Sequence, residues 1–178
     1  MDISIKTVIP FPLHNVYEAM RDHMPEMADF MPNVKAIEVQ SREKTADAVH
    51  LVNRWTPNAT EIPAVARPFV DPNKTYWMDY ATWKTNEKSC DWRLQMGFMA
   101  ERVDCKGTTT FQTIDENNTE MIIKGTLQLN LKGLVPRLFL NKATKGVEKF
   151  VAKLVQPNFE KTASALTQYL ETQKSASP

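Results

Sequence analysis

The segment TEMIIKGTLQLNL, residues 119–131, alternates between apolar and polar positions over its whole length. The odd-numbered positions from Met121 to Leu131 carry glycine or an apolar side chain, whereas most even-numbered positions carry a polar group. Side chains along a β-strand point alternately to opposite faces, so this pattern predicts a strand with one buried and one solvated face. Strands of that kind are typical of antiparallel sheets.

The same two-residue period recurs elsewhere and predicts six further strands, over residues 2–9, 34–42, 47–55, 75–84, 90–96 and 102–114. A helical period replaces it after Pro12, over 25–30, and over 143–172, where apolar residues form one stripe. A sheet with one apolar face and a helix with one apolar stripe are most simply buried against each other. We therefore expect an α+β, helix-grip architecture: a curved seven-stranded antiparallel sheet wrapped around a long C-terminal helix, with two short helices after the first strand.

Length and composition favour one globular domain. A chain of 178 residues is of single-domain size, and we expect that domain over 1–173 and a disordered tail over 174–178. Lys and Arg number 22 against 21 Asp and Glu, so the basic excess of a nucleic-acid-binding protein is missing. The first ten residues read as a strand rather than a signal peptide, and no run of about 18 apolar residues could span a membrane. We expect a cytoplasmic protein without a nucleic-acid partner; the sequence leaves its oligomeric state open.

Charges suggest a register for the hairpin formed by residues 90–114. Placing Arg93 opposite Asp104 and Asp91 opposite Lys106 pairs opposite charges. A shift by two residues would bring like charges together, which is destabilising. We therefore expect the first register, which leaves a four-residue loop between the strands, an acceptable length for a hairpin.

Three apolar segments are expected to meet at one end of the sheet. The order of the strands brings the connections 56–74 and 97–100 to the same end as residues 133–142, GLVPRLFLNK. Phe69 and Phe98 belong to the first two of these segments. Such side chains can form the rim of a cavity between sheet and helix, or they can simply plug the end of the core. Both readings stay open at this point.

The order of elements resembles the START-like (SRPBCC) superfamily, which includes polyketide cyclases, lipid-transfer domains and the birch-pollen-allergen group. The opening TVIPFPLHNVYEAM is similar to that superfamily's first strand and proline-capped helix. RWTPNATEIPAVARPFV, YATW, VDCKGTTTFQ and TEMIIKGTLQLN resemble a bacterial branch with no assigned function. Relatives often carry a Pro-Leu-Val-Gly-Gly-like link into the last helix, whereas this chain has GLVPR at 133–137. The resemblance implies an internal cavity for a lipid-like, aromatic or otherwise hydrophobic ligand.

No catalytic or metal-binding motif is visible in the sequence. His14, His23 and His50 lack metal-ligand spacing with each other and with the cysteines. Neither a glycine-rich phosphate loop nor a nucleophile signature is present. The expected hairpin register places Cys90 and Cys105 diagonally, beyond the usual disulfide distance, so both thiols should be free. We expect no metal, no cofactor and no catalytic residue that the sequence can name.

Candidate ligand-binding residues lie on faces assigned to the interior or on the apolar rim. A few polar groups in an apolar cavity orient a ligand, although each of them is more often a satisfied core residue. The strand 75–84 has aromatic residues on both faces, so its inward face is left open. The full set is Asn53, Trp55, Phe69, Tyr80, Trp92, Leu94, Met96, Phe98, Thr109, Phe111, Ile123, Leu127, Leu138, Phe139, Phe150, Leu154 and Asn158.

Three functions compete. Binding or transport of a hydrophobic small molecule (lipid, isoprenoid or aromatic and polyketide-like) is preferred, because no catalytic set is visible. The alternative is a polyketide cyclase or dehydratase-type enzyme, which needs an acid or base in the cavity, and Tyr80, Asp79 and Arg102 are the candidates. Transient membrane contact is the third, because basic residues beside apolar ones favour anionic surfaces, though these lysines can equally form a solvated helix face. They are Lys142, Lys145, Lys149 and Lys153.

Overall fold

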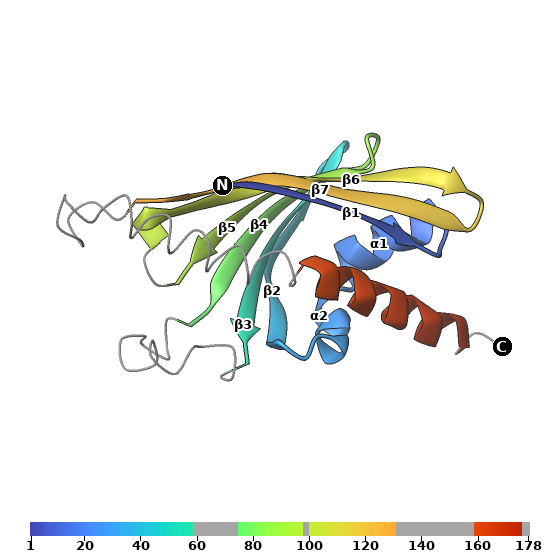
Figure 1. Ribbon diagram of the computed structural model, residues 1–178, viewed down its shortest axis with the longest axis horizontal. Coiled ribbons are helices and arrows are strands. Elements are labelled where there is room, and N and C mark those ends of the chain that lie inside the picture. The colour runs from blue at the N-terminus through green and yellow to red at the C-terminus, as the bar shows by residue number, and fades with distance from the viewer. Residues whose placement is uncertain (59–74, 98–99, 131–158, 176–178) are drawn as a thin grey trace.

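The computed structural model describes residues 1–58, 75–97, 100–130 and 159–175 (Figure 1). They contain one seven-stranded sheet in which every neighbouring pair of strands is antiparallel. The order across the sheet is β1-β7-β6-β5-β4-β3-β2, so a meander from β2 to β7 is completed by β1 beside β7. The strands are β1 (Asp2–Ile9), β2 (Val34–Lys44), β3 (Ala48–Pro57), β4 (Trp77–Lys84), β5 (Ser89–Met96), β6 (Val103–Asp115) and β7 (Asn118–Leu129).

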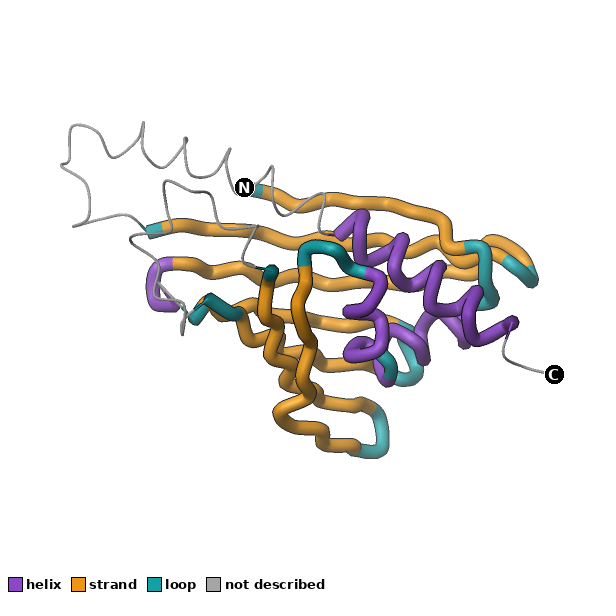
Figure 2. The backbone as a smooth tube through the Cα atoms, turned by 90° about the horizontal axis from the view of Figure 1, so that it is seen from below, coloured by secondary structure: helices purple, strands orange, loops and turns teal. Residues whose placement is uncertain are grey.

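The helices lie together on one side of the curved sheet (Figures 1 and 2). The chain enters the first of them directly after Pro12, where a proline removes no helical hydrogen bond. The helical elements are α1 (Leu13–Asp22), α2 (Met24–Met27), the 3-10 turn Ala28–Phe30 and a C-terminal helix described over 159–175. The expected curved sheet, the short helices after the first strand and the C-terminal helix are confirmed.

An aromatic cluster forms the centre of the core. Tyr17 of α1 is fully buried, and its ring packs edge-on against Trp83 and Phe111, with centroids 5.4 and 5.8 Å away. Ala165 and Leu166 of the C-terminal helix are also fully buried. Edge-to-face aromatic pairs contribute about 1 kcal/mol beyond the area they bury. Over its described part, the C-terminal helix therefore buries its apolar stripe against the sheet, as the sequence predicts.

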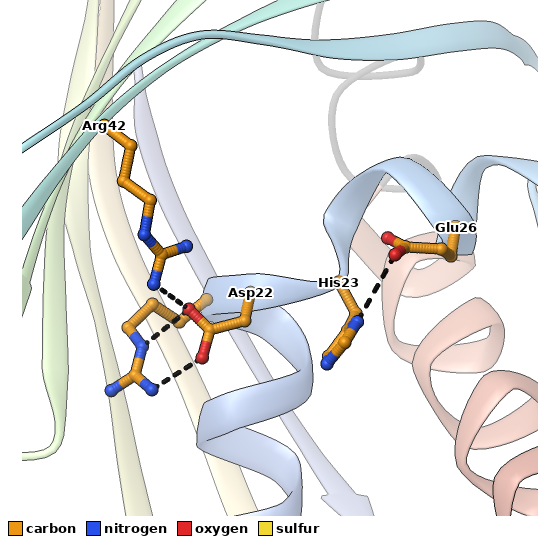
Figure 3. A network of polar contacts seen from close by, with 5 residues as sticks. Asp22, His23, Glu26 and Arg42 are labelled. Carbon is orange, nitrogen blue, oxygen red and sulfur yellow. Dashed lines mark hydrogen bonds and ion pairs between the residues drawn. The ribbon is translucent and has the colours of Figure 1, made fainter.

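A polar network fixes the end of α1 to the sheet (Figure 3). The carboxylate of Asp22 accepts hydrogen bonds from Arg21 at 2.6 and 2.9 Å and from Arg42 of β2 at 2.6 Å. Burial alone would raise the pKa of Asp22, but the two guanidinium groups outweigh it and lower that pKa. His23 lies between α1 and α2 and stacks on Tyr169 of the C-terminal helix. This histidine therefore packs at the junction of α1, α2 and the C-terminal helix.

The β5–β6 hairpin differs by two residues from the expected register. Arg93 lies opposite Lys106, not Asp104, so the prediction from charge pairing was wrong. The indole of Trp92 explains the difference, because it lies over the facing glycines Gly107 and Gly125. A Cβ atom on Gly107 would stand 2.5 Å from Cζ2 of this indole. Only this register places the large ring over the two positions that have no side chain.

The charged side chains adapt to that register. Arg93 reaches Asp104 diagonally, at 3.9 Å. Asp91 instead pairs with Lys84 at 2.9 Å and accepts a hydrogen bond from Thr108 at 2.7 Å. Exposed ion pairs contribute between zero and about 1 kcal/mol, less than the burial of a tryptophan side chain. Packing therefore decides the register, and charge follows.

The register also moves the cysteines and the connecting loop. Cys90 lies opposite Thr109 and Cys105 opposite Leu94, so the two thiols are not the diagonal neighbours that we expected. Both are free, as predicted, and both are buried. The connection from β5 to β6 is longer than four residues, because the 3-10 turn Ala100–Arg102 precedes β6.

The C-terminal boundary also differs from the sequence prediction. Lys174 and Ser175, which we assigned to a disordered tail, are helical. The hydroxyl of Ser175 donates to the carbonyl oxygen of Glu171 at 3.0 Å, one turn earlier. Serine hydroxyls within helices often bond in this way to the carbonyl four residues earlier.

We predict that Thr119→Val will lower the free energy of unfolding by about 1–3 kcal/mol. Thr119 is fully buried, and its hydroxyl donates to the carbonyl oxygen of Phe11 at 2.8 Å. Valine keeps the shape but leaves that carbonyl without this donor. Urea denaturation measures the loss. Thr113→Val is the control, because Thr113 lies opposite Thr119 but is exposed; equal effects of the two substitutions would contradict the assignment.

Candidate ligand site on the inner face of the sheet

Cross-strand register places all four tryptophans and one asparagine–aspartate pair on the inner face. Trp55 of β3 lies opposite Trp77 of β4, and their rings stack with centroids 5.5 Å apart. One pleat along, Asn53 lies opposite Asp79. Trp92 of β5 follows beside Ala81. The centre of this face is therefore apolar and aromatic, with one amide and one carboxyl group in its middle.

The inner face has two halves that differ in burial. We call one the packed half: Trp83, Cys90, Phe111 and Met121 are at most 4% exposed, and the rings of Trp83 and Phe111 pack against Tyr17. In Figure 2 the described helices gather over that end of the sheet. The other, the open half, comprises five partly buried residues and their two buried partners on β3, Asn53 and Trp55. The partly buried ones are Trp77, Asp79, Leu94, Met96 and Val103.

The open half lies at the sheet end that the sequence singled out. Trp77 begins β4 and lies opposite Met96, which ends β5. Val103 begins β6 and lies opposite Leu129, which ends β7. The connections 58–76, 97–102 and the stretch after residue 129 therefore leave from one end, as predicted. Their apolar side chains fall mostly outside the described residues.

Asp79 is the most unusual ionisable group on this face. Although part of the residue is accessible, its Oδ1 atom is buried without a hydrogen-bond partner in the described part of the chain. Burial raises the pKa of the carboxyl from 3.8 to about 7. Hydrogen bonding toward the side chains of Asn53 and Trp55 lowers that pKa in part, although Oδ1 of Asp79 and the indole N–H of Trp55 have no well-formed partner among the described residues. The carboxyl therefore titrates near neutral pH, where it can hold or release a proton.

Trp92 links the sheet to the C-terminal helix. Its indole N–H donates to the hydroxyl of Thr109 at 3.2 Å, and its ring lies 5.7 Å from that of Phe159. Thr109 is only 5% exposed, so this buried hydroxyl is satisfied by the indole. Trp92 and Thr109 therefore lie, hydrogen-bonded to each other, between the packed half and the open half.

Most of the predicted site residues that the structure describes lie on the inner face. Asn53, Trp55 and Leu94 adjoin Asp79 or its neighbours in the register. Phe111 and Ile123 belong to the packed part of the core rather than to the open half. The inner face also carries Trp92, Met96, Thr109 and Leu127. The remaining predicted residues, Phe69, Phe98, Leu138, Phe139, Phe150, Leu154 and Asn158, lie outside the described residues.

The prediction that Tyr80 lines the site was wrong. It is 42% exposed and donates to Gln95 on the opposite face of the sheet, at 3.2 Å. The inward face of β4 instead carries Trp77 and Asp79. Neither was in the predicted ligand-binding set, and Asp79 was named only as a candidate acid or base for the enzyme alternative. A four-residue turn between Lys84 and Ser89 sets this face, because one residue more or less would turn every side chain over. The sequence signal that could have placed Asp79 inward is the turn length. Counting back from the inward-facing Trp92 through a four-residue turn puts Ala81, and with it Asp79, on the same face.

Other reactive groups do not add to this site. Burial raises the pKa of Cys105 to about 11 and that of Cys90 well above its ordinary value, so neither is a ready thiolate. Within the described ranges, no group of three or more His, Cys, Asp or Glu side chains could hold a metal ion. No helix among the described residues is long and apolar enough to cross a membrane. Asp79 is thus the chemically distinctive residue of the inner face.

No protein-family model matches the chain, and no curated protein matches its sequence. Solved structures do match its fold. A protein from Thermus thermophilus superposes with a TM-score of 0.69 at 18% identity, covering 97% of this chain and 99% of its own. The Zhui aromatase/cyclase from a Streptomyces species has a TM-score of 0.69 at 16% identity, covering 99% of this chain and 96% of its own. Norcoclaurine synthase from Thalictrum flavum superposes with a TM-score of 0.60 at 10% identity, covering 96% of this chain and 86% of its own.

Proteins of several functions share this architecture. A START superfamily protein from Mycobacterium smegmatis matches with a TM-score of 0.57, covering 97% of this chain and 98% of its own, at 12% identity. Identities this low establish the fold and leave the activity to the site. On the strand order, the helix positions and these superpositions, the chain has the START-like (SRPBCC) helix-grip fold.

Proposed function

We propose that this protein binds a hydrophobic small molecule, a lipid, isoprenoid or aromatic and polyketide-like compound, in a cavity between the sheet and the C-terminal helix. The observation that supports it is the open half of the inner face. Stacked Trp55 and Trp77 there adjoin an amide and a carboxyl whose buried oxygens lack partners among the described residues. An apolar lining with a few convergent polar groups is the usual composition of a ligand site.

The fold neighbours support the same class of ligand. One is an aromatase/cyclase, and another is a norcoclaurine synthase solved in complex with dopamine and hydroxybenzaldehyde. Their ligands do not transfer directly at such low identity. They make an aromatic body of modest size the first choice for probes.

Native mass spectrometry of the freshly purified protein and titration with a fluorescent aromatic probe test the proposal. We expect Leu94→Trp to weaken probe binding at least ten-fold, because the larger side chain fills space in the open half. Gln95→Trp is the matched control, since Gln95 is the exposed neighbour on the other face. A protein that carries no ligand and binds neither fatty-acid nor aromatic probes would refute the proposal. So would equal effects of the two variants.

A cyclase or dehydratase-type enzyme is the second candidate, and Asp79 is the observation that favours it. A general acid or base works best with a pKa near the operating pH, and burial gives Asp79 a pKa of about 7. If the chain cyclises a poly-β-ketone thioester, Asp79→Asn should abolish the aromatic product detected by mass spectrometry. Asp104→Asn, which removes a carboxyl from the outer face, should not.

The membrane contact suggested by the sequence involves Lys142, Lys145, Lys149 and Lys153, which lie outside the described residues. It is a subsidiary proposal, in which the same rim would exchange ligand with an anionic bilayer. Co-sedimentation with phosphatidylserine vesicles tests it. Binding that does not fall when these lysines are changed to glutamine would contradict it.

A further inference from the structure

The open half of the inner face presents two hydrogen-bond acceptors side by side. Oδ1 of Asp79 and Oδ1 of Asn53 are both buried, and neither has a partner among the described residues. Asn53 as a whole is only 3% exposed. Buried polar atoms are nearly always paired in folded proteins, so these adjacent exceptions, which also include Nε1 of Trp55, indicate a partner that arrives with a ligand.

The surroundings of Asp79 supply no compensating positive charge within the described part of the chain. The groups that shift its pKa are its own burial, then Asn53 and Trp55; no cation is among them. Cys90 is the titratable neighbour on the packed side, and its burial favours the neutral thiol. Arg54, which follows Asn53 in the sequence, lies over the ring of Tyr76 at 4.4 Å. A buried carboxylate without a counter-charge is costly, and a cationic ligand would remove that cost.

We propose that Asp79 and Asn53 bind the protonated amine of a ligand whose hydrophobic body lies against Trp55 and Trp77. The inference rests on the proposed function and narrows it to a class of ligand. An ammonium group carries three donors and no acceptor, which suits two neighbouring acceptor oxygens. Indole faces attract cations through their electron-rich centres. A carboxylate ligand could accept from the unpartnered indole N–H of Trp55, but its charge would be repelled by the carboxylate of Asp79.

Three naphthalene probes that differ in the polar end test this inference at pH 7.5: 2-naphthylmethylamine, 2-naphthylmethanol and 2-naphthoic acid. Calorimetry on the full chain should show the amine binding most tightly and the acid most weakly. Asp79→Asn should weaken the amine roughly ten- to a hundred-fold, as expected for a charge-assisted hydrogen bond. It should change the affinity for the alcohol by much less. Asp104→Asn is the control, and circular dichroism checks that each variant is folded.

The outcomes separate the inference from the function on which it rests. Selective loss of amine binding in Asp79→Asn supports the inference. Equal affinities for the three probes, or an equal loss of all three in Asp79→Asn, overturns it and leaves a hydrophobic site in place. If none of the probes binds while native mass spectrometry reveals a bound molecule without an amine, the inference also fails and the proposed function stands. If neither method detects a ligand, both fail.

Discussion

Asp79→Asn is expected to make the protein more stable than the wild type at pH 8, by up to about 4 kcal/mol. The reason is the cost of burying a charge. The ordinary pKa of an aspartate, which applies in the unfolded chain, is 3.8, and the pKa of Asp79 in the folded protein is about 7. Between these values the folded state holds a proton that the unfolded state has released, so stability falls as the pH rises from about 4 to 7. Asparagine keeps the shape of the side chain and removes the ionisation.

Urea denaturation of both proteins from pH 5 to pH 8 measures this effect. The wild type should lose about 2–3 kcal/mol relative to Asp79→Asn over that range. Asp104→Asn is the matched control, because Asp104 is partly exposed and paired with Lys106 at 2.9 Å. A wild-type curve parallel to that of Asp79→Asn would show that the carboxyl is solvated, and the candidate site would lose its distinctive group.

Gly107→Ala is expected to destabilise the protein by about 3 kcal/mol or more, because it over-packs the centre of the sheet. A Cβ atom there would lie 2.2 Å from the carbonyl oxygen of Lys124 and 2.7 Å from the Cα atom of Gly125. Both contacts are with backbone, which cannot rotate away as a side chain can. The third contact, 2.5 Å from Trp92, would also displace the ring that sets the hairpin register.

Thermal denaturation and a double variant separate these contacts. Trp92→Leu added to Gly107→Ala should recover only part of the stability lost in Gly107→Ala, since the clash with the backbone of β7 remains. Lys106→Ala, at the neighbouring exposed position, is the control and should change stability by no more than about 0.5 kcal/mol. A fully stable Gly107→Ala protein would show that packing of Trp92 on the glycines does not determine the register.

The architecture was predictable because its signals are local and repeated. Each strand shows the two-residue period over several residues, and the observed bounds differ from the predicted ones by at most two residues. The hairpin register was not predictable from charge alone. It depends on Trp92 meeting Gly107 and Gly125, and Gly125 belongs to a third strand. Charge pairing compares residues on two neighbouring strands only, so it does not include the contact of Trp92 with Gly125 on the third strand.

The candidate site was only partly predictable, for a related reason. Asn53, Trp55, Trp92 and Leu94 follow from strands whose inward face is evident. Asp79 depends on the length of the turn before β5, in which Lys88 has a positive φ of 49°. Glycine or asparagine usually marks such a position, and the lysine concealed it. The site residues of the connecting segments lie outside the described residues and stay predictions.

The most direct test of the account uses the indole N–H signals of the four tryptophans, Trp55, Trp77, Trp83 and Trp92. Each signal is assigned with a single tryptophan-to-phenylalanine variant, and the protein is then titrated with the tightest-binding naphthalene probe. Ligand in the open half should move the signals of Trp55 and Trp77 and leave that of Trp83, in the packed half, in place. Unchanged signals of Trp55 and Trp77 at saturation, or an equal shift of Trp83, would contradict a ligand site on this face.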